Sequence, residues 1–80
     1  MNFKQVPMSR LRVGEKGKII FLEATGSLRR RMQDLGFYDG TVVESLHRSP
    51  SGDPAAYSVR GTVIALRDED AKKIILTVPV

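Results

Sequence analysis

Residues 26–37 read GSLRRRMQDLGF, a stretch that predicts a short amphipathic helix. Leu28, Met32 and Leu35 recur at positions i, i+4 and i+7, so they share one face of a helix over residues 28–35. That face is apolar, and we expect it to pack against the core of the protein.

The two ends of this helix also have sequence signals. Ser27 is the expected N-cap, because its hydroxyl can accept a hydrogen bond from a free N–H of the first turn. Gly36 is expected to end the helix in a left-handed conformation. Phe37 then follows where a Schellman motif places an apolar residue, and Met32 is its expected contact.

Three arginines lie directly after the expected N-cap. Arg29, Arg30 and Arg31 are therefore predicted to occupy the opening turn, where the helix dipole disfavours positive charge. Helical rotation places Arg31 at the edge of the apolar stripe and the other two toward solvent. Two interpretations stay open. The arginines form either an ordinary solvated face or a platform for an anionic surface, since guanidinium groups suit carboxylates and phosphates.

Outward from this helix, β-branched residues and glycine boundaries predict five short strands. The helix lies between the first two strands, and a helical turn over residues 68–73 precedes the last. In 80 residues this favours a mainly β fold, a small and partly open barrel. One domain is expected over residues 1–80, with residues 1–7 as a loose N-terminal tail. The expected strands are residues 18–23, 41–48, 56–60, 62–67 and 74–78.

The composition limits the chemistry. The chain has no cysteine and one histidine, so neither a Cys–His pair nor a His-ligated zinc site can form within one molecule. The histidine, His47, is expected on the surface of a strand. Asp68, Glu69 and Asp70 are the only acidic cluster, but consecutive positions in one turn point in different directions. We expect them to cap the short helix, and we predict no metal site, no cofactor and no enzymatic activity.

The charge and hydropathy indicate location and partners. The net charge of +4 permits an acidic partner such as nucleic acid, an acidic protein face or anionic lipid. The longest apolar runs, residues 19–22 and 63–66, are far shorter than the roughly 20 residues that span a bilayer. The chain also begins without the apolar segment of a secretory signal, so a cytoplasmic location is expected.

Four stretches of the chain form a distinctive ordered series: GEKGKI (14–19), LRRRMQDLGFYDGT (28–41), SPSGDPAAYSVRGTVIALR (49–67) and DAKKIILTV (70–78). Together they resemble the ferrous iron transport protein A (FeoA) family, from about Leu11 to Val78. The resemblance implies an SH3-like barrel and a non-enzymatic cytosolic accessory of bacterial ferrous iron uptake. Its implied partner is the cytosolic, GTPase-containing part of the membrane ferrous iron transporter B.

Two positions depart from the family pattern. Asp39 stands where a proline is usual, and Ser45 stands where the family tends to have an apolar strand residue. Ser45 indicates either a locally thinner core or a modified surface.

The leading hypothesis is a protein-binding surface on the helix and the turn after it. Its predicted contact residues are Arg29, Arg30, Arg31, Phe37 and Tyr38. The alternative is a basic nucleic-acid-binding module, although the aromatic residues are scattered along the chain and Phe21 and Tyr57 are expected in the core. An exposed strand edge would also allow a weak homo-oligomer.

Overall fold

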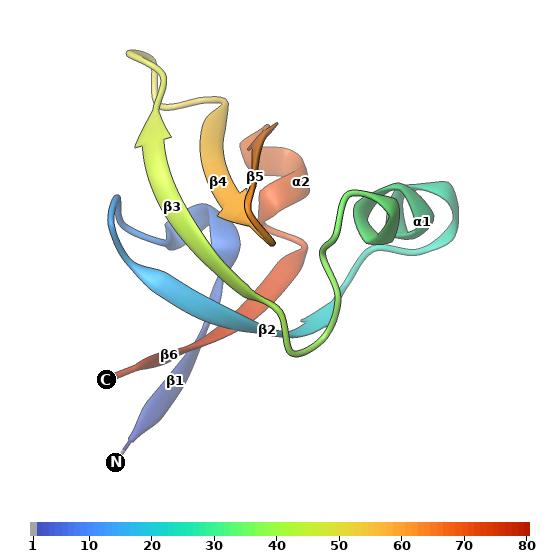
Figure 1. Ribbon diagram of the computed structural model, residues 1–80, viewed down its shortest axis with the longest axis horizontal. Coiled ribbons are helices and arrows are strands. Elements are labelled where there is room, and N and C mark those ends of the chain that lie inside the picture. Colours follow the sequence, from blue (N-terminus) through green and yellow to red (C-terminus); the bar gives the residue numbers. More distant parts are fainter. Residues whose placement is uncertain (1) are drawn as a thin grey trace.

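The computed structural model describes residues 2–80, in which six antiparallel strands form one curved sheet in the order β1-β6-β2-β3-β4-β5 (Figure 1). The strands are β1 (Phe3–Pro7), β2 (Lys16–Leu22), β3 (Val42–Arg48), β4 (Ala55–Val59), β5 (Thr62–Leu66) and β6 (Ile74–Pro79). The helices are the 3-10 helix η1 (Met8–Arg10), α1 (Gly26–Asp34) and α2 (Asp68–Ala71). The mainly β prediction is confirmed, with a helix between β2 and β3 and a helical turn before the last strand.

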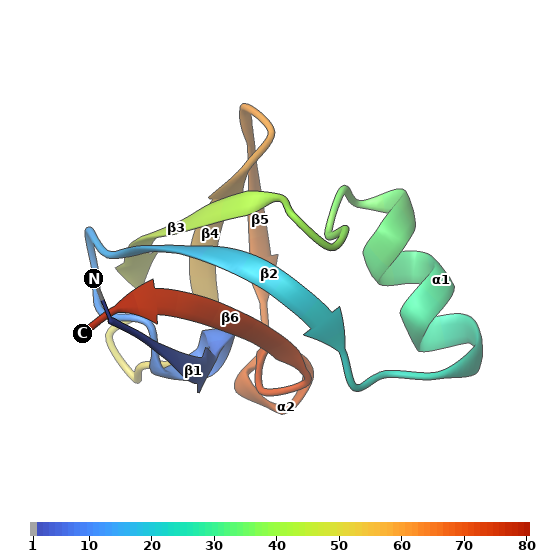
Figure 2. The same cartoon turned by 90° about the horizontal axis from the view of Figure 1, so that it is seen from below.

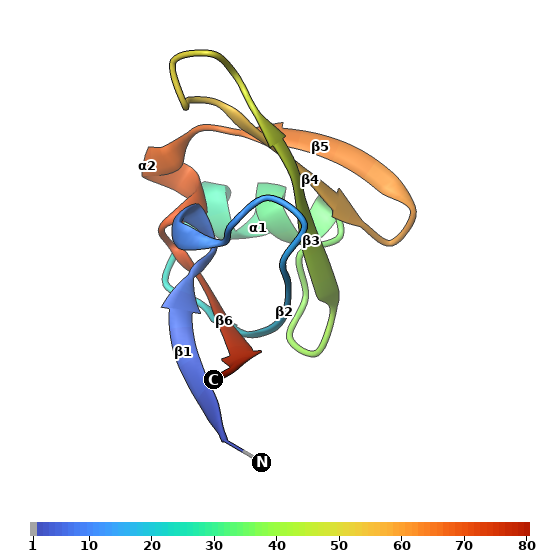
Figure 3. The same ribbon diagram turned by 90° about the vertical axis from the view of Figure 1, so that its left-hand side faces the viewer.

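The sheet has two free edges, so it does not close into a barrel. Figure 3 shows β1 and β6 side by side at one edge and β5 at the other. The core lies within the curve of the sheet and includes Met8, Leu11, Tyr57, Ile74 and Leu76, all inaccessible to solvent. Figure 2 shows α1 on the side of the sheet away from the start of β1 and the end of β6.

The N-terminal segment corrects the sequence-based expectation. Residues 3–7 are not a loose tail but form β1, which pairs with β6 from Phe3 opposite Pro79 to Pro7 opposite Ile75. Residue 1 of the expected tail lies outside the described residues. The side chains of β1 are exposed or half-buried. Its sequence therefore lacks the alternating apolar pattern that marks a strand with one buried face. Its stability comes instead from backbone pairing with β6, which local sequence does not reveal.

A β-bulge in β2 explains a second error. Ile19 pairs with Leu76 and Phe21 pairs with Ile75, so Ile20 is an extra residue in the ladder. An extra residue shifts the side-chain alternation by one position. Ile19 and Leu22 therefore both face the core, while Phe21 points outward with 41% of its surface exposed. The expectation that Phe21 is a core residue is wrong, whereas that for Tyr57 is confirmed.

The link between β4 and β5 is a tight turn. Val59 pairs with Thr62, so only Arg60 and Gly61 connect the strands. Both have positive φ, at 50° and 81°, as a two-residue type I′ hairpin requires. Gly61, the single residue between the expected strands 56–60 and 62–67, is therefore the second residue of this turn.

Ser45 lies in the core. It is fully buried on β3 opposite Tyr57, and its hydroxyl oxygen has no hydrogen-bond partner within residues 2–80. The interpretation of Ser45 as a modified surface residue is therefore wrong, since a small polar side chain occupies an interior position.

Candidate functional site: the surface of α1

The helix α1 begins earlier than the sequence predicts. Its N-cap is Thr25, and Gly26 is its first residue, so Ser27 lies inside the first turn rather than at the cap. Among the described residues, no side chain caps this end with a hydrogen bond. The Ser27 prediction failed because Thr25 is also a favoured cap residue and Gly26 tolerates the positive φ of 60° found there.

This earlier start changes the meaning of the arginines. Arg29 and Arg30 fall beyond the first three residues of α1, and Arg31 lies in its last turn, where the helix dipole favours positive charge. The prediction that all three oppose the dipole from the opening turn is therefore wrong. A functional role has to be judged from what each guanidinium contacts.

The three arginines have different contacts. Arg29 is half-buried, and its Nη1 donates to the backbone oxygen of Leu22 at 3.3 Å. The Nη2 of Arg31 lies 3.5 Å from Oδ2 of Asp70 in α2, although the Arg31 side chain remains 63% exposed. Arg30 is exposed and makes no hydrogen bond or ion pair within residues 2–80. Its guanidinium is thus available to a partner.

The C-terminal end of α1 forms the predicted Schellman motif. The N–H of Phe37 donates to the oxygen of Met32 at 3.0 Å, and the N–H of Gly36 donates to the oxygen of Gln33 at 3.0 Å. Met32 and Phe37 are both buried in the core cluster. The prediction of Phe37 as a contact residue is therefore wrong, because its side chain anchors the end of the helix.

Two apolar side chains near this end are exposed. Tyr38, a predicted contact residue, has 46% of its surface accessible, and Leu35 has 39%. Leu35 was expected on the buried stripe, but it is the C-cap residue, where the chain leaves the helix. The sequence signal that the helix ends at Leu35 was the glycine that follows it, Gly36. We call Arg30, Arg31, Leu35 and Tyr38 the α1 surface.

The acidic cluster lies at the start of α2, where the dipole favours negative charge. The N–H of Asp68 is capped by Oδ1 of Asp53, at 3.0 Å, from the loop after β3. The carboxylates of Asp68 and Asp70 instead form ion pairs with arginines. Oδ1 of Asp68 lies 3.6 Å from Nη1 of Arg48, and Asp70 pairs with Arg31. Side-chain capping by the cluster itself is therefore not what the structure shows.

Other expected features can be placed directly. Within residues 2–80, no group of three or more histidine or acidic side chains is arranged to hold a metal ion. His47 is exposed on β3, as predicted. No helix in the described part of the chain is long and apolar enough to cross a membrane.

Comparisons with known proteins agree with this architecture. The FeoA domain family model matches residues 6–78. The chain is 33% identical, over 67 residues and 84% of its length, to the Fe(2+) transport protein A/Fe(2+) transporter FeoB fusion protein of Porphyromonas gingivalis, of which it spans only 8%.

Solved structures are also similar. The solution structure of iron(II) transport protein A from Clostridium thermocellum has a TM-score of 0.88 and 32% identity, with 91% of this chain and 45% of that chain covered. The Stenotrophomonas maltophilia FeoA, complexed with zinc and described as a prokaryotic SH3 domain protein, has a TM-score of 0.77 and 27% identity, with 86% of each chain covered. The SH3-like prediction is confirmed.

Proposed function

Since the chain belongs to the FeoA domain family, which is involved in ferrous iron transport, we propose that it is a non-enzymatic cytosolic accessory of ferrous iron uptake. In this proposal it binds the cytosolic, GTPase-containing part of ferrous iron transporter B. The supporting observation is the P. gingivalis relative, in which an FeoA-type domain and an FeoB transporter share one chain. Fusion of two modules raises their effective concentration, which benefits a pair that must associate.

We place the contact on the α1 surface. Arg30 offers a guanidinium without an internal partner, and Arg31 keeps most of its side chain exposed beside Asp70. Leu35 and Tyr38 add exposed apolar area next to these charges. Arginine and tyrosine are enriched among residues that dominate binding energy at protein interfaces. An acidic patch on the transporter would complement this surface.

Arg29 and Phe37 have a different role in this proposal. The guanidinium of Arg29 holds the oxygen of Leu22, and Phe37 fills the core beneath the helix end. Both therefore position the α1 surface without contacting the partner.

The test is an NMR titration of the isotope-labelled chain with the cytosolic region of the transporter B from the same organism. We expect localised amide shifts over residues 28–38. The variant Arg30→Glu should weaken binding by roughly tenfold, because it replaces attraction by repulsion at the interface. The matched control is Arg12→Glu, whose side chain is 83% exposed in the loop before β2 and should bind like the natural chain.

Either of two results would overturn this placement. Shifts confined to other elements at saturating partner would move the contact elsewhere. Equal affinities for Arg30→Glu and Arg12→Glu, with both variants folded, would show that Arg30 makes no contribution.

A further inference from the structure

The outward side of the sheet carries exposed apolar residues. Strand register places alternate residues of β1, β6, β2 and β3 on the side away from the core. Phe3 is 58% exposed, Val42 53% and Phe21 41%. We call this side the outer sheet face. Its apolar members are Phe3, Pro7, Phe21, Val42, Ile75 and Pro79.

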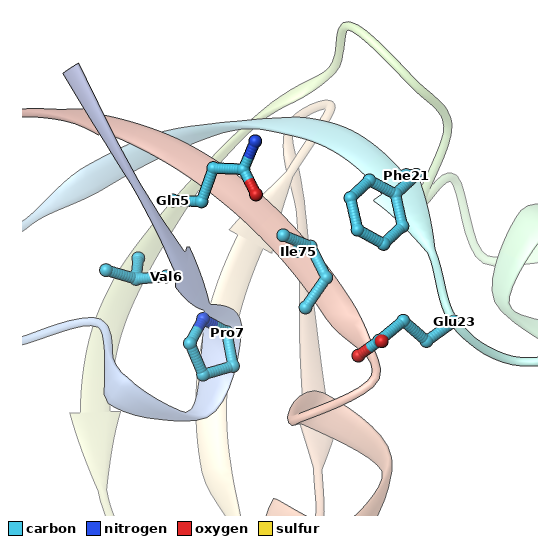
Figure 4. A pocket seen from close by; sticks show the side chains of 6 residues that line it. All are labelled: Gln5, Val6, Pro7, Phe21, Glu23 and Ile75. Carbon is cyan, nitrogen blue, oxygen red and sulfur yellow. The ribbon is translucent and has the colours of Figure 1, made fainter.

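Two hollows lie at the two ends of the outer sheet face. The first, of about 250 Å³, is shown in Figure 4, where Phe21, Glu23, Gln5 and Ile75 surround it together with Val6 and Pro7. The second has a similar volume, about 260 Å³, at the other end of β2 and β6. Its outward side chains are Phe3, Lys16, Lys18, Val42, Thr77 and Pro79.

The two hollows carry opposite charge. Glu23 is the only ionisable residue lining the first, whereas Lys16 and Lys18 line the second. Glu44 lies opposite Lys16 on β3 and reduces the charge there, while Lys18 lies opposite Thr77 and Val42. Neither Glu23 nor Lys18 forms an ion pair within residues 2–80.

From this arrangement we propose that the outer sheet face is the interface of a homodimer of this chain. An interface with two-fold symmetry uses the same patch on both copies, so the patch must complement itself. When the two-fold axis lies in the interface and crosses the strands, the basic end of one copy faces the acidic end of the other. Strand β6 then runs antiparallel to β6 of the second copy.

This orientation also matches the apolar residues. Because each strand then stacks on the same strand of the other copy, Phe3 of each copy lies toward the end of the outer sheet face that holds Pro7 of the other. Lys18 of each copy faces Glu23 of the other. The alternative two-fold axis, along the strands, would place the basic end of one copy against the basic end of the other, which repulsion disfavours.

Charge also limits the strength and the kind of association. Two copies that each carry a net charge of +4 repel one another at long range, so the dimer is weak and forms at high concentration. Glu23 and Glu44 on the same face oppose the phosphates of a nucleic acid. A second copy therefore fits this face better than nucleic acid, despite its two phenylalanines and two lysines.

The experiment is sedimentation equilibrium of the full chain from about 10 µM to about 1 mM, a range that detects a weak dimer. We expect a concentration-dependent dimer. The single variants Glu23→Lys and Lys18→Glu should each weaken it by about tenfold, because each places like charges together at two symmetric contacts. Mixing the two variants in equal amounts should restore dimerisation as a heterodimer, since both contacts again join opposite charges.

An apolar pair supplies a further control. Phe3→Ser should weaken the dimer, whereas Val63→Ser, at a position 63% exposed on β5 and away from this face, should leave it unchanged. A chain that stays monomeric to the highest concentration overturns the proposal. So does a mixture no more dimeric than the separate variants, or tight binding of a single-stranded oligonucleotide by this face.

This inference is independent of the proposed function. The charge swap reports on the outer sheet face alone, whereas the transporter titration reports on residues 28–38. A monomeric chain with shifts at the α1 surface would remove only the dimer.

Discussion

The two helices that precede and follow β2 are held in opposite ways. The 3-10 helix η1 has only three residues, yet side chains from distant strands fix its backbone. Arg48 Nη2 donates to the oxygens of Ser9, at 2.7 Å, and Leu11, at 3.1 Å, and the hydroxyl of Tyr57 donates to Met8 at 3.4 Å. The nine-residue α1 satisfies most of its own carbonyls, so its arginines point to solvent or make single contacts.

The difference shows what decides the role of an arginine. Backbone carbonyls without a ladder partner need donors, and a guanidinium with several N–H groups can supply them to more than one segment. Arg48 therefore acts as a structural clamp between β3, η1 and the loop after β3. Arg30 lies in a helix that pairs most of its own carbonyls, which leaves its charge for another molecule.

The largest expected effect tests this clamp. Arg48→Ala removes three hydrogen bonds and the ion pair with Asp68, and it leaves half-buried carbonyls without donors. We expect the free energy of unfolding, measured in urea, to fall by about 3 kcal/mol. Arg30→Ala is the matched control and should change it by less than about 0.5 kcal/mol. Similar values for the two variants would contradict the contrast between η1 and α1.

The next effect concerns the end of α1. Gly36 has a φ of 107°, a region that L side chains rarely adopt, and a Cβ there would also lie 3.4 Å from the Arg60 side chain. Gly36→Ala should lower the free energy of unfolding by about 1–2 kcal/mol. Thermal unfolding monitored by circular dichroism measures it. An unchanged melting temperature would mean that the Schellman motif does not hold α1 in place.

A smaller effect of opposite sign is expected beside η1. Ser45 pairs through its backbone with Gly14 and Glu15 in the loop after η1, but its buried hydroxyl has no partner in the described part of the chain. Ser45→Ala removes an unsatisfied polar group while it keeps these backbone bonds, so the protein should become more stable by about 1 kcal/mol. Chemical denaturation measures the change. A loss of stability would instead indicate that the hydroxyl has a partner in solution.

The smallest effect appears only at high pH. Burial raises the pKa of the Tyr57 hydroxyl above its ordinary value of 10.0, an effect that the charge of Arg48 opposes and the charges of Asp68 and Asp53 reinforce. Above pH 10 the unfolded chain releases this proton first, so stability falls as pH rises. Below pH 10 this contribution is constant.

The variant Tyr57→Phe isolates that contribution. Its melting temperature should fall less steeply above about pH 10 than that of the natural chain. Tyr38→Phe, at an exposed position, should follow the natural chain. Parallel curves for Tyr57→Phe and the natural chain would show that the buried hydroxyl does not contribute to alkaline unfolding.

Local signals in the sequence predicted much of this fold. The left-handed glycine after α1 and the strands β4 and β5 depend on neighbouring residues, and the structure confirms them. The same is true of the Schellman motif that joins Met32 and Phe37, because its residues are close in sequence. Exposure of Tyr38 also agrees with its predicted place at the surface.

The candidate site was harder to predict than the fold. Which arginine stays free depends on where α1 begins and on two contacts from other elements. Arg29 donates to Leu22 in β2, and Arg31 lies beside Asp70 in α2. Leu35 is exposed because the chain turns away from the helix at that residue. Periodicity alone placed it on the buried stripe.

By itself, then, the sequence determined those features whose free energy lies in short-range backbone preferences: the helix, its C-terminal cap and the mainly β character. Only the tertiary structure decided the pairing of β1 with β6, the bulge that turns Phe21 outward and the burial of Ser45. These features depend on contacts between residues far apart in the chain. The same contacts pair the strands and decide which side of the sheet is buried. The outer sheet face and its opposite charges belong to this second group.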